Sequence, residues 1–222
     1  MTRVVGRFFR GCAVVAAALS LASCSHGSQP SASPSTGALV PEDRFDSLFL
    51  SVGELGALIG LPISDSSTTE GRPDPAINHT QDDIKVPCEM LKTALVSQNV
   101  YGTDFTRYRL VSQSASQGHG QIDYTVALYP DAAKSTAAFQ HLADGFHTCR
   151  LNGGRNGAFS LGEDSSTKLT WTVPMAGDDA ICATNARITS NVVITTRTCM
   201  PKSNAGDAAE KIGDAIDARA GG

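Results

Sequence analysis

The segment 180–200 constrains the fold of this chain more than any other, because it reads as a β-hairpin with a cysteine near each end. Two runs of strand-forming residues flank Ser190-Asn191, a pair typical of a tight turn. With a two-residue turn there, counting outward along both strands brings Cys182 opposite Cys199. This is a non-hydrogen-bonded position, where the Cα atoms approach to about 4.5 Å and a disulfide can form. A shift of the turn by one residue would separate the two cysteines.

Disulfides persist in oxidising compartments outside the cytoplasm. The N-terminal residues predict that the chain is exported to such a compartment. Residues 1–23 contain three arginines and no acidic residue, and residues 11–22 are small or apolar. This run is too short to span a bilayer and is typical of a signal peptide. Residues 21–24 (LASC) resemble a bacterial lipobox, which implies that Cys24 is acylated and becomes the first residue of a lipoprotein. Ordinary cleavage beside an incidental cysteine is the alternative.

The exported part of the chain reads as a tether followed by one domain. Residues 24–41 are rich in serine, proline, glycine and alanine, so they bury too little apolar surface to fold. Residues 42–222 are long enough for a single core. Without the signal peptide the chain keeps 15 basic and 22 acidic residues, a formal charge of −7. This excess disfavours nucleic acid and anionic lipid headgroups as partners, so the lipid anchor is the predicted contact with the cell membrane, on its extracytoplasmic side.

Four cysteines remain once the signal-peptide cysteine is removed and Cys24 is acylated. An even number in an exported chain favours two disulfides. If Cys182 pairs with Cys199, the second disulfide joins Cys88 to Cys149. A metal site is the alternative, but the sequence has no CxxC pair or close cysteine and histidine cluster, and we expect no metal.

The remaining pattern mixes antiparallel strands with a few helices and predicts an α+β fold. A capping box at Ser51 and Glu54 begins a helix that ends at Gly60. Residues 64–83, polar and interrupted by two prolines, predict a long exposed loop, and residues 152–164 predict a glycine-rich connection. Further strands are expected at 106–114, 121–129 and 168–173, with helices at 131–149 and 204–219.

Four segments, in this order, carry a resemblance to a known family: FLSVGELGALIG, AAFQHLADGFHTC, NVVITTRTC and AAEKIGDAIDARA, with cysteine spacings of 61 and 17. Over residues 45–218 the chain resembles the extracytoplasmic sensor domains of mycobacterial receptor serine/threonine kinases of the PknH type, which also occur in lipoproteins without a kinase. The resemblance implies a curved antiparallel sheet flanked by helices, a broad cleft for a ligand, and the cysteine pairing that the hairpin suggests. Phe146 stands where the family often has tryptophan, and Thr195 where it often has an acidic residue; if these positions touch ligand, specificity differs.

The sequence carries no catalytic motif, and we expect neither an enzyme nor a cofactor. It lacks GxSxG, HExxH, P-loop and dinucleotide-binding patterns, and the glycine-rich residues 153–157 read as a loop. His141 and His147, six residues apart on a helix, do not share a face at ligand spacing. Asp178-Asp179 reads as a solvated turn rather than a cation site. A hydrolase with an unrecognised site is the remaining enzymatic alternative.

Four residues on predicted strands fit either a cleft or a core, so ligand contacts stay unassigned: Trp171, Tyr124, Tyr108 and Arg109. Two functions agree with these features. The first is a lipid-anchored extracytoplasmic binding module for a small molecule, a lipid or a cell-wall fragment. The second is a surface interaction protein that modulates a membrane partner such as a receptor kinase. We expect no kinase domain and no spanning helix, so any signal would pass through another protein.

Overall fold

The computed structural model describes residues 37–73, 88–96, 98–116, 120–151, 159–175 and 179–222. Within these residues, seven strands form one antiparallel sheet. Across the sheet their order is β1 (Ile63–Glu70), β2 (Arg107–Ala115), β3 (Gly120–Leu128), β7 (Val192–Pro201), β6 (Ala180–Thr189), β5 (Lys168–Pro174) and β4 (Ser160–Asp164). The predicted α+β fold with an antiparallel sheet is confirmed.

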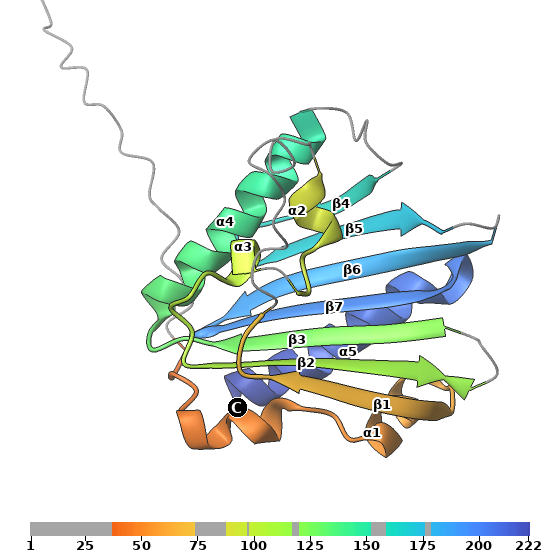
Figure 1. The fold of residues 1–222 in the computed structure, drawn as a ribbon, viewed down its shortest axis with the longest axis horizontal. Coiled ribbons are helices and arrows are strands. Elements are labelled where there is room, and N and C mark those ends of the chain that lie inside the picture. The colour runs from red at the N-terminus through yellow and green to blue at the C-terminus, as the bar shows by residue number, and fades with distance from the viewer. Residues whose placement is uncertain (1–36, 74–87, 97, 117–119, 152–158, 176–178) are drawn as a thin grey trace, which may run out of the picture. The chain divides into compact units, whose positions relative to one another are not determined.

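Helices cover both faces of this sheet (Figure 1). In chain order they are the 3-10 helix η1 (Glu42–Leu48), α1 (Val52–Ile59), α2 (Glu89–Lys92), α3 (Gln98–Tyr101), α4 (Ala132–Leu151) and α5 (Lys202–Gly221). One buried apolar cluster packs η1, α1 and α5 against one face of the sheet. A second cluster packs α2, α3 and α4 against the other face. The sheet therefore separates two cores, and side chains that alternate along the central strands enter them in turn.

The central hairpin has the register that the sequence predicts. Strands β6 and β7 join through a two-residue turn, and Cys182 lies opposite Cys199 and is bonded to it. The second disulfide joins Cys88 to Cys149. It ties the residue before α2 to the last turn of α4, so it fixes the start of this four-residue helix against α4.

The turn of this hairpin also holds the start of the domain. The side chain of Asn191 is buried, and its Nδ2 donates to the carbonyl oxygens of Val40 at 3.1 Å and Tyr129 at 2.7 Å. Its Oδ1 accepts from the backbone N–H of Val40 at 2.8 Å. Val40, which the sequence places in the tether, is 3% exposed and belongs to the packed domain.

The predicted helices form for local reasons. At the start of α1, Ser51 and Glu54 make both hydrogen bonds of a capping box, and Gly60 ends the helix with a φ of 72°. In α4, Phe139, Leu142 and Phe146 are buried on one face, as their spacing predicts.

Two predicted loops at the edges of the sheet are wrong. All of β1 but its first residue falls in the predicted loop 64–83, and β4 falls in the predicted connection 152–164; residues 74–83 and 152–158 of these two predictions lie outside the described residues. Both are edge strands whose side chains are mostly exposed. A strand that buries neither face shows no alternation of apolar and polar residues, so only its pairing with β2 or β5 reveals it.

No helix in the described part of the chain is both long enough and apolar enough to cross a membrane.

Candidate functional site

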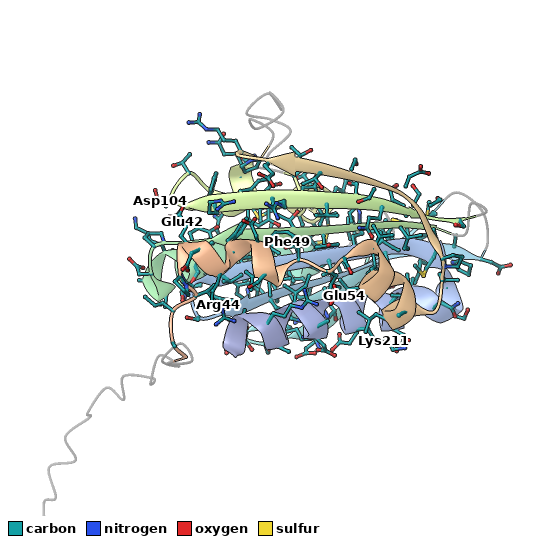
Figure 2. The ribbon with its side chains drawn as sticks, turned by 90° about the horizontal axis from the view of Figure 1, so that it is seen from below. Glu42, Arg44, Phe49, Glu54, Asp104 and Lys211 are labelled. Atoms are coloured by element: carbon teal, nitrogen blue, oxygen red, sulfur yellow. A yellow bond between two sulfur atoms is a disulfide. The ribbon has the colours of Figure 1, made fainter. Side chains whose placement is uncertain are left out.

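A surface groove lies between the β1 edge of the sheet and the segment that links η1 to α1. We call Phe49–Val52, which is this link together with the first residue of α1, the strap, and Figure 2 views it from outside with Phe49 labelled. The groove has a volume of about 390 Å³ and is open to solvent on one side. It is lined by the strap and by side chains of three strands: Ser66, Thr68 and Glu70 of β1, Arg109, Val111 and Gln113 of β2, and Tyr124 of β3.

The register of the sheet places these strand residues together. Thr68 pairs with Val111, and Val111 pairs with Tyr124, so all three lie in one row across the sheet. Positions two residues away on each strand point to the same face, which brings Arg109 and Gln113 to either side of that row. The floor of the groove is therefore a patch of sheet, and the strap forms its opposite wall.

The strap is held by groups from elsewhere in the fold. Arg219, near the end of α5, donates to the carbonyl oxygen of Phe49 at 2.5 Å and to Glu54 at 2.7 Å. The Tyr124 hydroxyl donates to the carbonyl oxygen of Leu50 at 3.2 Å. Burial raises the pKa of Tyr124 to about 12, so this hydroxyl remains a proton donor at neutral pH.

The pKa of Glu54 is shifted in the opposite direction from that of Tyr124. Hydrogen bonds from the backbone and side chain of Ser51, followed by the bond from Arg219, lower the pKa of the Glu54 carboxyl. The carboxylate therefore stays ionised while it accepts all of these bonds. The wall of the groove, the cap of α1 and the end of α5 form one connected network.

Arg109 crosses the end of the groove under two aromatic rings. Its guanidinium carbon lies 4.4 Å from the ring centre of Phe49 and 5.5 Å from that of Phe45. Its Nη2 bonds to Asp46 at 2.5 Å and also pairs with Glu70. Its Nε is buried and has no hydrogen-bond partner among the described residues. One donor of this guanidinium is therefore unused.

Gln113 carries the second unused group. Its side chain is 3% exposed, and its Nε2 bonds to Ser66 Oγ at 3.3 Å while Oε1 has no partner in the described structure. If the amide were turned over, Oε1 would accept from Ser66 and the nitrogen would be the unpaired end. In either orientation one end of a buried amide lacks a partner, which costs about 1–3 kcal/mol.

Two of the four residues that the sequence left as either cleft or core residues line the groove, and the other two lie in the second apolar cluster. Arg109 and Tyr124 line the groove. Tyr108 is buried under the other face, where its hydroxyl donates to the carbonyl oxygen of Leu95 at 2.9 Å. Trp171 is 1% exposed and packs against Phe146 in the second cluster. Tyr108 and Trp171 are therefore core residues, and Arg109 and Tyr124 are groove residues.

The two positions that differ from the family pattern lie inside the second core and not in the groove. Phe146 is fully buried, and Thr195 Oγ1 bonds to the hydroxyl of Tyr101 at 3.0 Å. His147 is exposed on α4 and bonds to Asp164 at 3.0 Å. His141 borders a separate hollow beside α3. Cys24, residues 153–157 and Asp178 lie outside the described residues.

The groups in the groove suit binding better than catalysis. They offer hydroxyls, an amide, one unused guanidinium donor and an aromatic ring, with two charged residues, Arg109 and Glu70, paired to each other. Among the described residues no set of three or more histidine, cysteine, aspartate or glutamate side chains could hold a metal ion.

Comparison with known proteins agrees with this architecture. The family model described as the PknH-like extracellular domain matches residues 40–219. The chain belongs to this family. The crystal structure of the extracellular domain of PknH from Mycobacterium tuberculosis is similar to this PknH-like domain, with a TM-score of 0.55 and 20% identity over 82% of this chain and 99% of that one. None of the curated proteins matches the chain.

Family membership makes this an extracellular domain, which is consistent with binding or sensing outside the cytoplasm. Sequence reasoning did not single out the strap or Gln113 of this PknH-like domain. Alternation along β2 gives the face on which Gln113 lies, but its place in the groove also depends on the strap, which is distant in the sequence.

Proposed function

We propose that this PknH-like domain is a lipid-anchored extracytoplasmic binding module that holds a small ligand in the groove under the strap. The observation that carries the proposal is the pair of buried, unused polar groups on Arg109 and Gln113 at the floor of one groove. Buried polar groups are nearly always paired, and a group left unpaired in a cleft calls for a bound partner. The groove volume lies at the lower end of the range of about 300–1,000 Å³ typical of small-molecule sites.

The strap offers a route by which binding could be sensed. It follows directly on η1, which itself follows Val40, the first buried residue of the described domain. The same strap bonds to Arg219 at the end of α5. A ligand that presses on Phe49 would therefore act on the segment that enters from the membrane side.

The ligand is tested with the full chain, expressed with its own N-terminus in a lipoprotein-processing host and purified from membranes. Native mass spectrometry followed by organic extraction should find a molecule in near-stoichiometric amount, absent from a Gln113→Leu preparation. A Gln140→Leu preparation is the control, since Gln140 is exposed on α4 far along the chain. Empty wild-type protein, together with a stable partner crosslinked in intact cells, would replace the proposal with the partner-modulating function.

The anchor is tested separately with Cys24→Ser. Wild-type protein should carry diacylglycerol and fractionate with membranes, because each buried methylene contributes about 0.8 kcal/mol and two chains hold stably. The variant should lose the lipid and leave the membrane fraction. An unmodified Cys24 in the wild-type protein would refute the anchor without affecting the groove.

A further inference from the structure

The polarity of the groove selects a class of ligand, and this inference rests on the proposed binding function. We infer that the groove binds a neutral, polyhydroxylated molecule, a sugar or the end of a glycan, through separate hydroxyl groups, one at Arg109 Nε and another at the amide of Gln113.

Charge argues against an anion. Arg109 and Glu70 are the charged residues that line the groove, and they pair with each other. Arg109 also pairs with Asp46, which is itself 3.5 Å from Arg107. A phosphate or carboxylate would find a guanidinium already paired with two carboxylates, so no unpaired positive charge would attract it.

Charge argues equally against a cationic ligand. The carboxylates of Asp46 and Glu70 are both engaged by Arg109. A cation would have to displace an arginine that is also stacked against Phe49 and Phe45. The groove therefore offers no unpaired charge of either sign.

The unused groups argue against a wholly apolar ligand. Arg109 Nε and the Gln113 amide oxygen are already buried without partners, and a hydrocarbon ligand would leave that cost unrelieved, whereas a ligand with hydroxyl groups can offer them hydrogen bonds. One hydroxyl of a ligand can accept from the guanidinium N–H, and another can donate to the amide oxygen or, if the amide is turned over, accept from its nitrogen. Hydroxyls of Ser66 and Thr68 continue this polar surface toward the open rim.

The opposite wall of the groove is apolar. Phe49, Leu50 and Val52 line it, and Phe49 is only partly buried. A sugar ring has apolar C–H faces that pack against an aromatic ring, while its edge carries hydroxyls. This division between a polar floor and an apolar wall matches the two sides of a pyranose ring.

The experiment uses the full chain in a detergent without a sugar headgroup, because an alkyl glycoside would compete for the site. A glycan array that carries neutral, carboxylated, sulfated and phosphorylated glycans gives the first readout. Titrations of maltose, cellobiose, lactose and N,N′-diacetylchitobiose, followed by saturation-transfer NMR, give the second. We expect saturable binding of neutral glycans and weaker binding of their anionic counterparts.

Two pairs of variants locate the site. Gln113→Leu should weaken binding of a neutral glycan about tenfold or more, as expected when a ligand loses a hydrogen bond to a buried group, while Gln140→Leu leaves it unchanged. Thr68→Tyr should block the groove from its exposed rim, while Thr69→Tyr, on the opposite face of β1, should not. Tyrosine is favoured in strands, so both tyrosine variants should fold.

Some results would refute the neutral glycan as ligand but leave the proposed binding function intact, and others would refute both. Array signals confined to anionic glycans, or neutral binding unaffected by Gln113→Leu and Thr68→Tyr, would refute the neutral ligand or its place. A non-glycan molecule extracted from wild-type protein and absent from the Gln113→Leu preparation would refute the ligand class and keep the binding module. Empty wild-type protein and an array without signals would refute both.

Discussion

Replacing Gln113 by leucine is expected to stabilise the protein without ligand, which is the reverse of most substitutions at a buried position. The side chain is 3% exposed, and one end of its amide has no partner among the described residues. Leucine has a similar volume, so the change should leave no large cavity. An unsatisfied buried polar group costs about 1–3 kcal/mol, and leucine removes that cost.

The change also removes the hydrogen bond between Gln113 and Ser66. At 3.3 Å this bond is long, and Ser66 is exposed, so water can take the place of the amide. An ordinary hydrogen bond contributes about 0.5–1.5 kcal/mol, and this one falls at the low end. The net effect is a gain of about 1 kcal/mol in the free energy of unfolding. In a domain of this size that gain raises the melting temperature by about 2–4 °C.

Urea unfolding of the purified full chain, followed by circular dichroism, measures this difference directly. Gln140→Leu makes the same chemical change at an exposed position and should stay within about 0.5 kcal/mol of wild type. A loss of more than about 1 kcal/mol in Gln113→Leu would show that the amide is fully bonded in solution, for example by a buried water. The groove would then have no unmet polar group at Gln113, and the argument for a ligand there would fail.

Three further outcomes follow from the contacts described above. Replacing Cys88 and Cys149 by alanine should lower the free energy of unfolding by about 4 kcal/mol, and replacing Cys182 and Cys199 should lower it by about 3 kcal/mol, because the first disulfide closes the longer loop. Urea unfolding measures both losses. A larger loss for the shorter loop would contradict this account, in which the disulfides act by reducing the entropy of the unfolded chain. The pKa of Glu54 is lowered in the folded protein from an ordinary value of 4.5, so its contribution is complete above that value and is lost as the pH falls through the folded pKa. Glu54→Gln should therefore flatten the fall of the urea midpoint below pH 4.5, and an unchanged acid profile would count against the capping network.

Much of the fold could be predicted from the sequence because its signals are local. A two-residue turn sets the register of β6 and β7, and the register alone brings Cys182 opposite Cys199. The capping box of α1 needs only Ser51 and Glu54, three residues apart. The apolar face of α4 follows from helical spacing. None of these features depends on a distant part of the chain.

The edge strand β1 shows where local reasoning ends. Its sequence from Ile63 to Glu70 is polar, and nearly every side chain is exposed. Such a segment has no apolar face to bury, so nothing within it favours a strand over a loop. Its strand conformation comes from the backbone hydrogen bonds with β2, which the sequence of β1 does not encode.

The sequence by itself determined the hairpin register, the helix caps and faces and, through the resemblance, the family; it also predicted an acylated Cys24, which remains a prediction. Only the tertiary structure decided which polar residues meet in a groove. Arg109 and Gln113 are ordinary members of an alternating strand until the strap lies opposite them and a groove forms between. Burial and unmet hydrogen bonds depend on that packing between distant segments, and no pattern along one strand can specify it.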